Sequence, residues 1–143
     1  MKNSAEAKAI SRCIMSKTGI ENRGIDNRFF SFLCQACESA PFHQTLGMKL
    51  TYLGKGEAGL KIIPKMELTT IRGRLHGGIS ATLADTAMGW AFITLGYNCV
   101  TMDMYTNYLT PSYAEEELTV EGKVIHLGKR SGVAEAYLYN GKG

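Results

Sequence analysis

The chain carries a single acidic side chain within a long apolar segment. Asp85 is the only charged residue between Gly78 and Gly96. The apolar residues around it cover nearly the whole circumference of a helix, which is typical of a buried helix. A buried carboxylate is costly unless it is paired, hydrogen-bonded or used in a reaction. Asp85 is therefore a candidate catalytic group, with a hydrogen-bonded core aspartate as the alternative.

Two glycines stand where this helix is expected to begin. Gly77 and Gly78 follow His76, and because glycine is a poor helix former, another requirement is indicated at these positions. Glycines let a substrate approach the main chain closely, and the first N–H groups of a helix have no partner inside it. Such donors, supported by the helix dipole, stabilise an oxyanion. A glycine turn that binds no ligand is the alternative.

The spacing of these groups has a consequence for assembly. Gly78 and Asp85 are seven residues apart. On a helix they lie on nearly the same face, about 10 Å apart along the axis. One helix therefore does not bring both groups to a single reacting carbonyl. Two antiparallel copies of the helix across a dimer would place the glycines of one subunit near the acid of the other, so the chemistry requires a dimer.

The elements around the acid follow from the hydrophobic period. The helix that carries it is expected at residues 76–95, ended by Gly96. The pattern before it predicts a helix at 4–17, a loop at 20–27 and a helix through 29–37, which is capped by Asp26-Asn27 and broken by Pro41. Strands are expected at 47–53 and 57–63, and a loop at 65–75. The period then changes to 2, which predicts strands at 100–111, 118–126 and 131–139. This order predicts an α+β fold, an antiparallel sheet wrapped around one long central helix.

The sequence ends in Asn140-Gly141-Lys142-Gly143. Asn-Gly after an alternating strand is a strong hairpin signal. A partner strand of about 6–8 residues is expected to follow it, and the sequence does not contain one.

Length and composition limit the function further. The 143 residues fit one domain, and a net charge of +3 with scattered basic residues argues against nucleic-acid binding. The cysteines lack the second Cys or His pair of a zinc site, which predicts four reduced thiols and no metal; they are Cys13, Cys34, Cys37 and Cys99. The first 12 residues have no targeting pattern, and the apolar stretch at 79–95 is short for a membrane span. A soluble, cytoplasmic protein is predicted.

The motifs bear a specific resemblance. Leu75-His-Gly-Gly-Ile-Ser-Ala-Thr-Leu-Ala-Asp85 resembles the signature of the PaaI-like (phenylacetate-pathway type) hotdog acyl-CoA thioesterases, in which HGG is followed by six residues and an acid. Thr101-Met-Asp-Met-Tyr-Thr-Asn-Tyr-Leu-Thr-Pro111 is similar to the family's next strand, and Leu46-Gly-Met-Lys-Leu50 to its first. The resemblance implies a hotdog domain at residues 41–143, with the family's last strand missing, after an N-terminal helical extension at residues 1–40.

The resemblance also implies roles for matching residues. Asp85 would be general base or nucleophile in thioester hydrolysis, and the amides of Gly77 and Gly78 would bind the thioester oxygen. His76 would shape that loop, and Thr101 would help to hold the attacking water.

A turn of three residues and one loop residue carry further expectations from the resemblance. Lys129, Arg130 and Ser131 match a turn that lies close to coenzyme A in relatives, where basic residues suit phosphates; a solvated turn is the equal alternative. Relatives usually have Asn or Gln six residues before the histidine, where this chain has Thr70. A hydroxyl can donate and accept a hydrogen bond but reaches less far, so weaker activity or a reassigned role is expected.

Together with these features, the resemblance implies hydrolysis of an acyl-CoA thioester without a cofactor, in a homodimer or homotetramer with its active site at the subunit interface. A non-catalytic acyl-CoA binding or sensing protein is the alternative, which Thr70 slightly favours. A hotdog hydratase or dehydratase fits HGG-x6-D less well, and no G-x-S-x-G motif of a serine hydrolase occurs. The acyl group stays open. Side chains that either line a pocket or belong to the core are Met88, Trp90, Phe92, Tyr105 and Tyr108.

Overall fold

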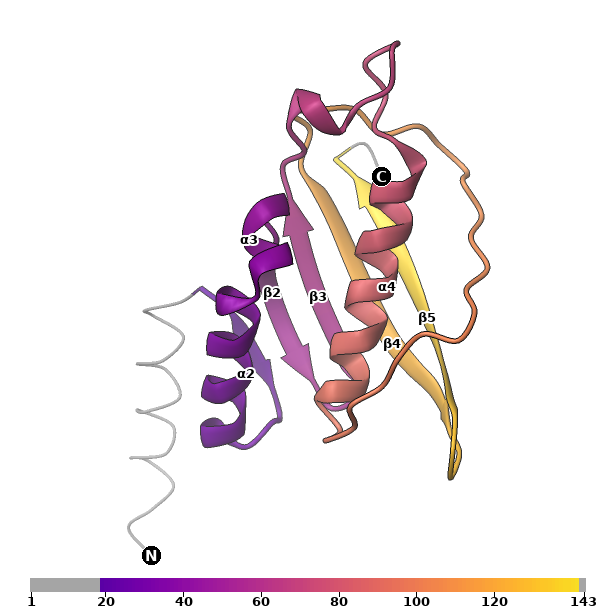
Figure 1. Ribbon diagram of the computed structural model, residues 1–143. Coiled ribbons are helices and arrows are strands. Elements are labelled where there is room, and N and C mark those ends of the chain that lie inside the picture. Colours follow the sequence, from indigo (N-terminus) through magenta and orange to yellow (C-terminus); the bar gives the residue numbers. More distant parts are fainter. Residues whose placement is uncertain (1–18, 142–143) are drawn as a thin grey trace, which may run out of the picture.

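A computed structural model describes residues 19–141 and shows one sheet lying against one long helix (Figure 1). The elements are β1 (Glu21–Arg23), α2 (Asn27–Ser39), α3 (Pro41–Leu46), β2 (Lys49–Gly54), β3 (Glu57–Ile62), the short 3-10 helix η1 (Met66–Leu68), α4 (Gly77–Ile93), β4 (Leu118–Leu127) and β5 (Gly132–Asn140). The predicted α+β architecture, a mostly antiparallel sheet around one long helix, is confirmed. The helix predicted at residues 4–17 lies outside the described residues.

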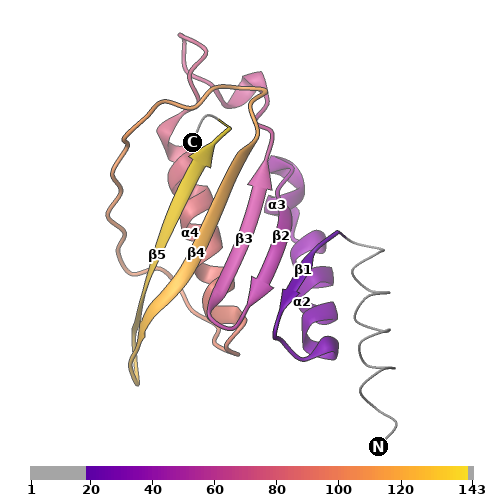
Figure 2. The same ribbon diagram turned by 180° about the vertical axis from the view of Figure 1, so that it is seen from behind.

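The sheet has the order β1-β2-β3-β4-β5, and Figure 2 shows its face turned away from α4. β1 runs parallel to β2, and all other neighbours are antiparallel. β1 corrects the prediction of a loop at residues 20–27. Its three polar residues give no alternation signal. The strand is instead held by its pairing with β2 and by the guanidinium of Arg23, which stacks 3.5 Å from the centre of the Tyr52 ring.

The N-terminal helices follow capping rules. Asp26 begins α2 as predicted, and its carboxylate accepts hydrogen bonds from the N–H groups of Arg28 and Phe29 at 3.1 and 3.2 Å. Pro41 comes after the end of α2, but it is also the first residue of α3, where its missing N–H costs nothing. Because α3 occupies residues 41–46, the next strand begins at Lys49, two residues later than predicted.

α4 packs on the sheet through one of its faces. Its buried residues are Leu83, Ala87, Trp90 and Ala91. Gly122 of β4 permits a very close approach, because a Cβ atom there would lie 2.5 Å from the carbonyl carbon of Ala87. The prediction of a helix buried on nearly all sides is wrong for a single chain, since one sheet covers only one face. No helix among residues 19–141 has the length and apolar character needed to cross a lipid bilayer.

The segment after α4 departs from its prediction. Residues 98–109 are extended, as the alternating pattern predicted, but they form no strand of the sheet and stand apart from β5 (Figures 1 and 2). Val100 and Met102 are 87% and 85% exposed. A strand needs a partner backbone as well as an extended conformation, and within the described residues this segment has none. It is held to α4 by side chains instead.

The paired cysteines belong to the packing between α2 and α3. Cys34 and Cys37 are buried and form no disulfide. Cys37 Sγ lies 3.2 Å from Nδ1 of the buried His43, and that nitrogen also lies 3.0 Å from the Cys37 carbonyl oxygen. The His43 ring packs against Trp90 of α4, with 5.8 Å between ring centres. In the part of the chain that the structure describes, no group of three or more His, Cys, Asp or Glu side chains is placed to hold a metal ion.

This burial predicts a difference in thiol reactivity. Burial raises the pKa of Cys34 to about 11 and that of Cys37 to about 12. Because only the thiolate reacts, roughly one in a thousand or fewer of these thiols is reactive at pH 8. We expect an alkylating reagent at pH 8 to label the exposed Cys99 in the folded protein, and Cys34 and Cys37 only in urea. Peptide mapping measures the labelling, and equal labelling rates in the folded protein would contradict this packing.

The close approach of α4 to β4 predicts a stability change. We expect Gly122→Ala to lower the free energy of unfolding by about 1–3 kcal/mol, because the new methyl group forces two backbones apart. The matched control is Gly89→Ala in α4, where a Cβ would meet no atom within 4 Å. Helix propensity makes that change neutral or stabilising by up to about 1 kcal/mol. Urea unfolding followed by circular dichroism measures both, and equal effects would disprove the contact.

Candidate active site

His76 caps the N-terminus of α4 with its own side chain. The residue has extended backbone angles, φ −64° and ψ 130°, and its ring Nδ1 accepts a hydrogen bond of 2.9 Å from the N–H of Gly78. A ring nitrogen that accepts a hydrogen bond carries no proton. The imidazole therefore presents its Nδ1 lone pair to the helix. Of the two glycine amides predicted to face a substrate, that of Gly78 is engaged inside the chain.

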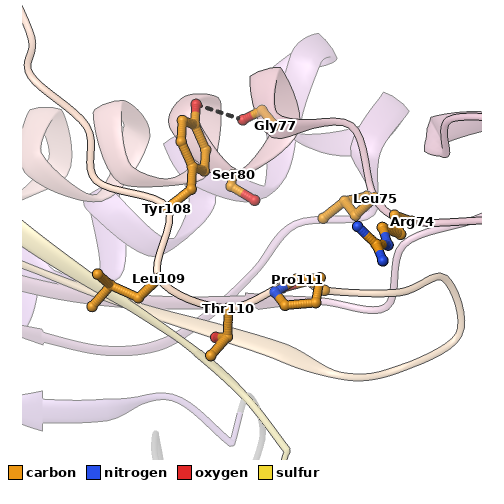
Figure 3. A pocket seen from close by; sticks show the side chains of 9 residues that line it. Arg74, Leu75, Gly77, Ser80, Tyr108, Leu109, Thr110 and Pro111 are labelled. Atoms are coloured by element: carbon orange, nitrogen blue, oxygen red, sulfur yellow. Dashed lines mark hydrogen bonds between the residues drawn. The ribbon is translucent and has the colours of Figure 1, made fainter.

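Gly77 presents the free amide of the pair. It is the first residue of α4, so its N–H has no partner in the helix, and no acceptor for it is found among residues 19–141. Its carbonyl oxygen accepts a hydrogen bond of 3.1 Å from the phenol of Tyr108 (Figure 3). A Cβ at this position would lie 3.3 Å from the Tyr108 ring. The missing side chain therefore lets the ring lie directly on the main chain.

Asp85 lies on the face of α4 that the sheet leaves open. The residue is half-buried, and its Oδ1 accepts a hydrogen bond of 2.5 Å from the hydroxyl of Thr101. Thr101 belongs to the extended segment after the helix. The hydrogen bond fixes one carboxylate oxygen and leaves the other free to take a proton or to attack.

The two halves of the predicted site do not meet within one chain. Gly77 and Asp85 are eight residues apart on α4, which is about 12 Å along the axis. The other predicted residues also lie apart. Thr70 is exposed in the loop before α4, where its main chain bonds to that of Arg74 and Gly73. Residues 129–131 form the exposed turn between β4 and β5, at the opposite end of the sheet from the start of α4 (Figure 1).

A pocket of about 290 Å³ adjoins Gly77. Its walls are the first turn of α4, residues 74–75 before the helix and residues 108–112 (Figure 3). Among its side chains the sequence pattern singled out only Tyr108. Arg74 and Ser80 carried no signal, because an arginine in a loop and a serine in a helix are common surface residues. Only the fold brings them together.

Comparison with known proteins adds a family to this geometry. The model of the family described as Thioesterase superfamily matches residues 72–143, half of the chain, which includes all of α4 and the two strands after it. A putative esterase from Saccharolobus solfataricus is 37% identical over 98 residues, 67% of this chain and 65% of the relative. The acyl-coenzyme A thioesterase PaaI from Escherichia coli is 28% identical over 97 residues, 68% of this chain and 69% of that protein. The alignments with the first three curated relatives span only 64–65% of their lengths.

Solved structures show the same fold. A solved member of the thioesterase superfamily is 32% identical with a TM-score of 0.73, over 82% of this chain and 90% of that one. A hypothetical thioesterase protein from Streptococcus pneumoniae, solved with coenzyme A, is 26% identical with a TM-score of 0.65, over 67% and 77%. The E. coli PaaI protein gives a TM-score of 0.72 at 24% identity, over 79% and 86%, and supports the fold alone. The chain belongs to the thioesterase superfamily, and the PaaI-like hotdog fold predicted from its sequence is confirmed.

Proposed function

We propose that the chain hydrolyses an acyl-CoA thioester to a free acid and coenzyme A. The observation that carries the proposal is the hydrogen bond from Thr101 to Asp85, which orients a carboxylate on the open face of α4. The unpaired amide of Gly77 supplies the second component. The names of the relatives, among them an acyl-coenzyme A thioesterase, support the same activity.

Each group has a defined part in the proposed reaction. The oxygen of a water molecule attacks the thioester carbonyl carbon while Asp85 takes the proton from that water. The negative charge that develops on the carbonyl oxygen is stabilised by the Gly77 N–H and by the dipole of α4. The carbon–sulfur bond then breaks, and the coenzyme A thiolate recovers the proton from Asp85. Direct attack by Asp85 would instead give an anhydride that water opens.

The proposal requires two copies of the chain. Because Gly77 and Asp85 lie about 12 Å apart along one helix, a second α4 running antiparallel against the open face brings the amide of one subunit to the acid of the other. In the same arrangement, the turn at residues 129–131 of one subunit lies near the start of α4 in the other. The basic side chains of this turn suit the phosphates of coenzyme A. A homodimer is the smallest assembly that meets this requirement.

A binding protein without catalysis remains the second candidate. Thr70 stands where the family resemblance leads us to expect an amide side chain, and its hydroxyl makes no hydrogen bond to any other described residue. Calorimetry with several acyl-CoAs, run beside an assay for released thiol, separates the two candidates. Binding without thiol release supports the second.

Removing the carboxylate tests the catalytic role. We expect Asp85→Asn to reduce kcat by roughly a hundredfold or more, because the amide cannot accept the proton from water. The matched control is Asp103→Asn, an exposed aspartate in the same extended segment as Thr101, which is expected to keep wild-type activity. Release of free thiol from acyl-CoA measures both. Wild-type turnover in the Asp85 variant would remove this mechanism.

Mixing two inactive variants tests the shared site. Gly77→Pro deletes the amide proton at a helix position where proline is favoured, and the extended angles of His76 suit a following proline. Gly77→Ala, which keeps the proton, is its control. We expect a mixture of Gly77→Pro and Asp85→Asn chains to regain about a quarter of wild-type activity, because half of the dimers carry one intact site. A mixture that stays inactive after subunit exchange would place both groups in one chain.

A further inference from the structure

The pocket beside Gly77 has a cation on its wall. Arg74 is an exposed residue that lines it, and Figure 3 shows the guanidinium beside Leu75 at one edge of the pocket. Across residues 19–141 the guanidinium makes no hydrogen bond or salt bridge. Its main chain is nevertheless fixed, because its carbonyl accepts a hydrogen bond from Thr70 and it pairs with Tyr113 in an isolated bridge. The main chain of Arg74 is therefore fixed beside the pocket, and its exposed guanidinium forms no ion pair within residues 19–141.

Two hydroxyl side chains also line the pocket. The hydroxyl of Ser80 points toward the middle of the pocket from the first turn of α4, and Thr110 lies on the opposite wall (Figure 3). Tyr108 lies directly against Gly77, and Leu109 is a further, exposed lining residue. A hydrocarbon group bound here would displace water from Arg74 and Ser80 without replacing its hydrogen bonds, which costs free energy. A group with oxygen atoms at its far end would satisfy them.

We propose that this pocket holds the acyl part of the substrate, and that Arg74 selects acyl groups with a carboxylate at the end remote from the thioester. The substrates are then CoA thioesters of short dicarboxylic acids. This inference rests on the proposed thioester hydrolysis. It assigns the thioester oxygen to Gly77 and the terminal carboxylate to Arg74, two residues that line one pocket.

The size of the pocket favours a short acyl group. Its volume of about 290 Å³ is near the lower end of small-molecule sites, which begin at roughly 300 Å³. A cavity of about 150 Å³ already holds benzene. The pocket therefore has room for a chain of a few carbons with a carboxylate.

A second source of anionic oxygen is the coenzyme A phosphates. These phosphates are separated from the sulfur by the whole pantetheine arm. Arg74 shares one small pocket with Gly77, to which we assign the thioester oxygen. An anion at Arg74 therefore belongs to the acyl side of the thioester, and phosphate binding is the outcome that the experiment must exclude.

The test compares matched substrates in matched variants. The ratio of kcat/KM for succinyl-CoA to that for butyryl-CoA is measured in the wild type, Arg74→Met, Arg74→Lys and Arg72→Met. Arg72 is an exposed arginine of the same loop that does not line the pocket. We expect Arg74→Met to lower the ratio by roughly 10- to 100-fold, the range of a charge-assisted hydrogen bond. Lysine should restore part of it, and Arg72→Met should leave it unchanged.

Two further measurements make each outcome decisive. The same thioesters on N-acetylcysteamine lack the phosphates, and they should show the same dependence on Arg74. A different result is that Arg74→Met lowers kcat/KM equally for both CoA thioesters and leaves it unchanged for the N-acetylcysteamine thioesters. That result would assign Arg74 to the phosphates and overturn the inference. Calorimetry with carboxypropyl-CoA and butyl-CoA thioethers reports the selection even if no thioester is hydrolysed, which separates failure of this inference from failure of the proposed function. No preference for the carboxylate in the wild type would also overturn it.

Discussion

The contact between α4 and β4 at Gly122 is the constraint on which the rest of the structure depends. Because no side chain separates the strand from the backbone at Ala87, the helix sits as close to the sheet as two backbones can. This fixes its rotation. Asp85 precedes Ala87 by two residues, about 200° around the helix, so the acid faces away from the sheet. One glycine in a strand therefore decides that the only charge of the helix is on the open face.

At the N-terminus of the same helix, some main-chain groups hold the turn together and another is left for a substrate. The His76 ring accepts a hydrogen bond from the Gly78 N–H, and the Tyr108 hydroxyl donates one to the Gly77 carbonyl. Both contacts hold the turn in one geometry, and the Gly77 N–H has no acceptor among residues 19–141. A preorganised donor of this kind needs no rearrangement when charge develops on a substrate. The pair of glycines thus serves two different needs, a close aromatic contact at one position and a cap at the next.

The sequence predicted most of this fold because its signals were local. Asp26 caps α2 through its own side chain, α4 follows from its long apolar run, and the strands β4 and β5 follow from their alternating pattern. Failures occurred where a neighbour decides the structure. β1 exists because β2 pairs with it, and residues 98–109 are extended without a partner strand. In the site, Asp85 and the glycines stood out as chemically unusual residues on a helix. Arg74 gave no such signal, because its importance comes from a pocket whose two walls lie 28 or more residues apart in sequence.

The extended segment that ties the site together is longer than the helix it follows. Thr101 attaches it to Asp85, and Tyr108 attaches it to Gly77. The two attachment points are seven residues apart on the segment and eight residues apart on α4. Fully extended, that stretch reaches about 23 Å, whereas the helix covers about 12 Å. The surplus makes the segment bow outward from α4 (Figure 1). The segment is attached to α4 at both of its ends, through Thr101 and Tyr108. A displacement of its middle residues therefore moves the hydrogen-bond donor of Asp85 and the tyrosine at Gly77 together.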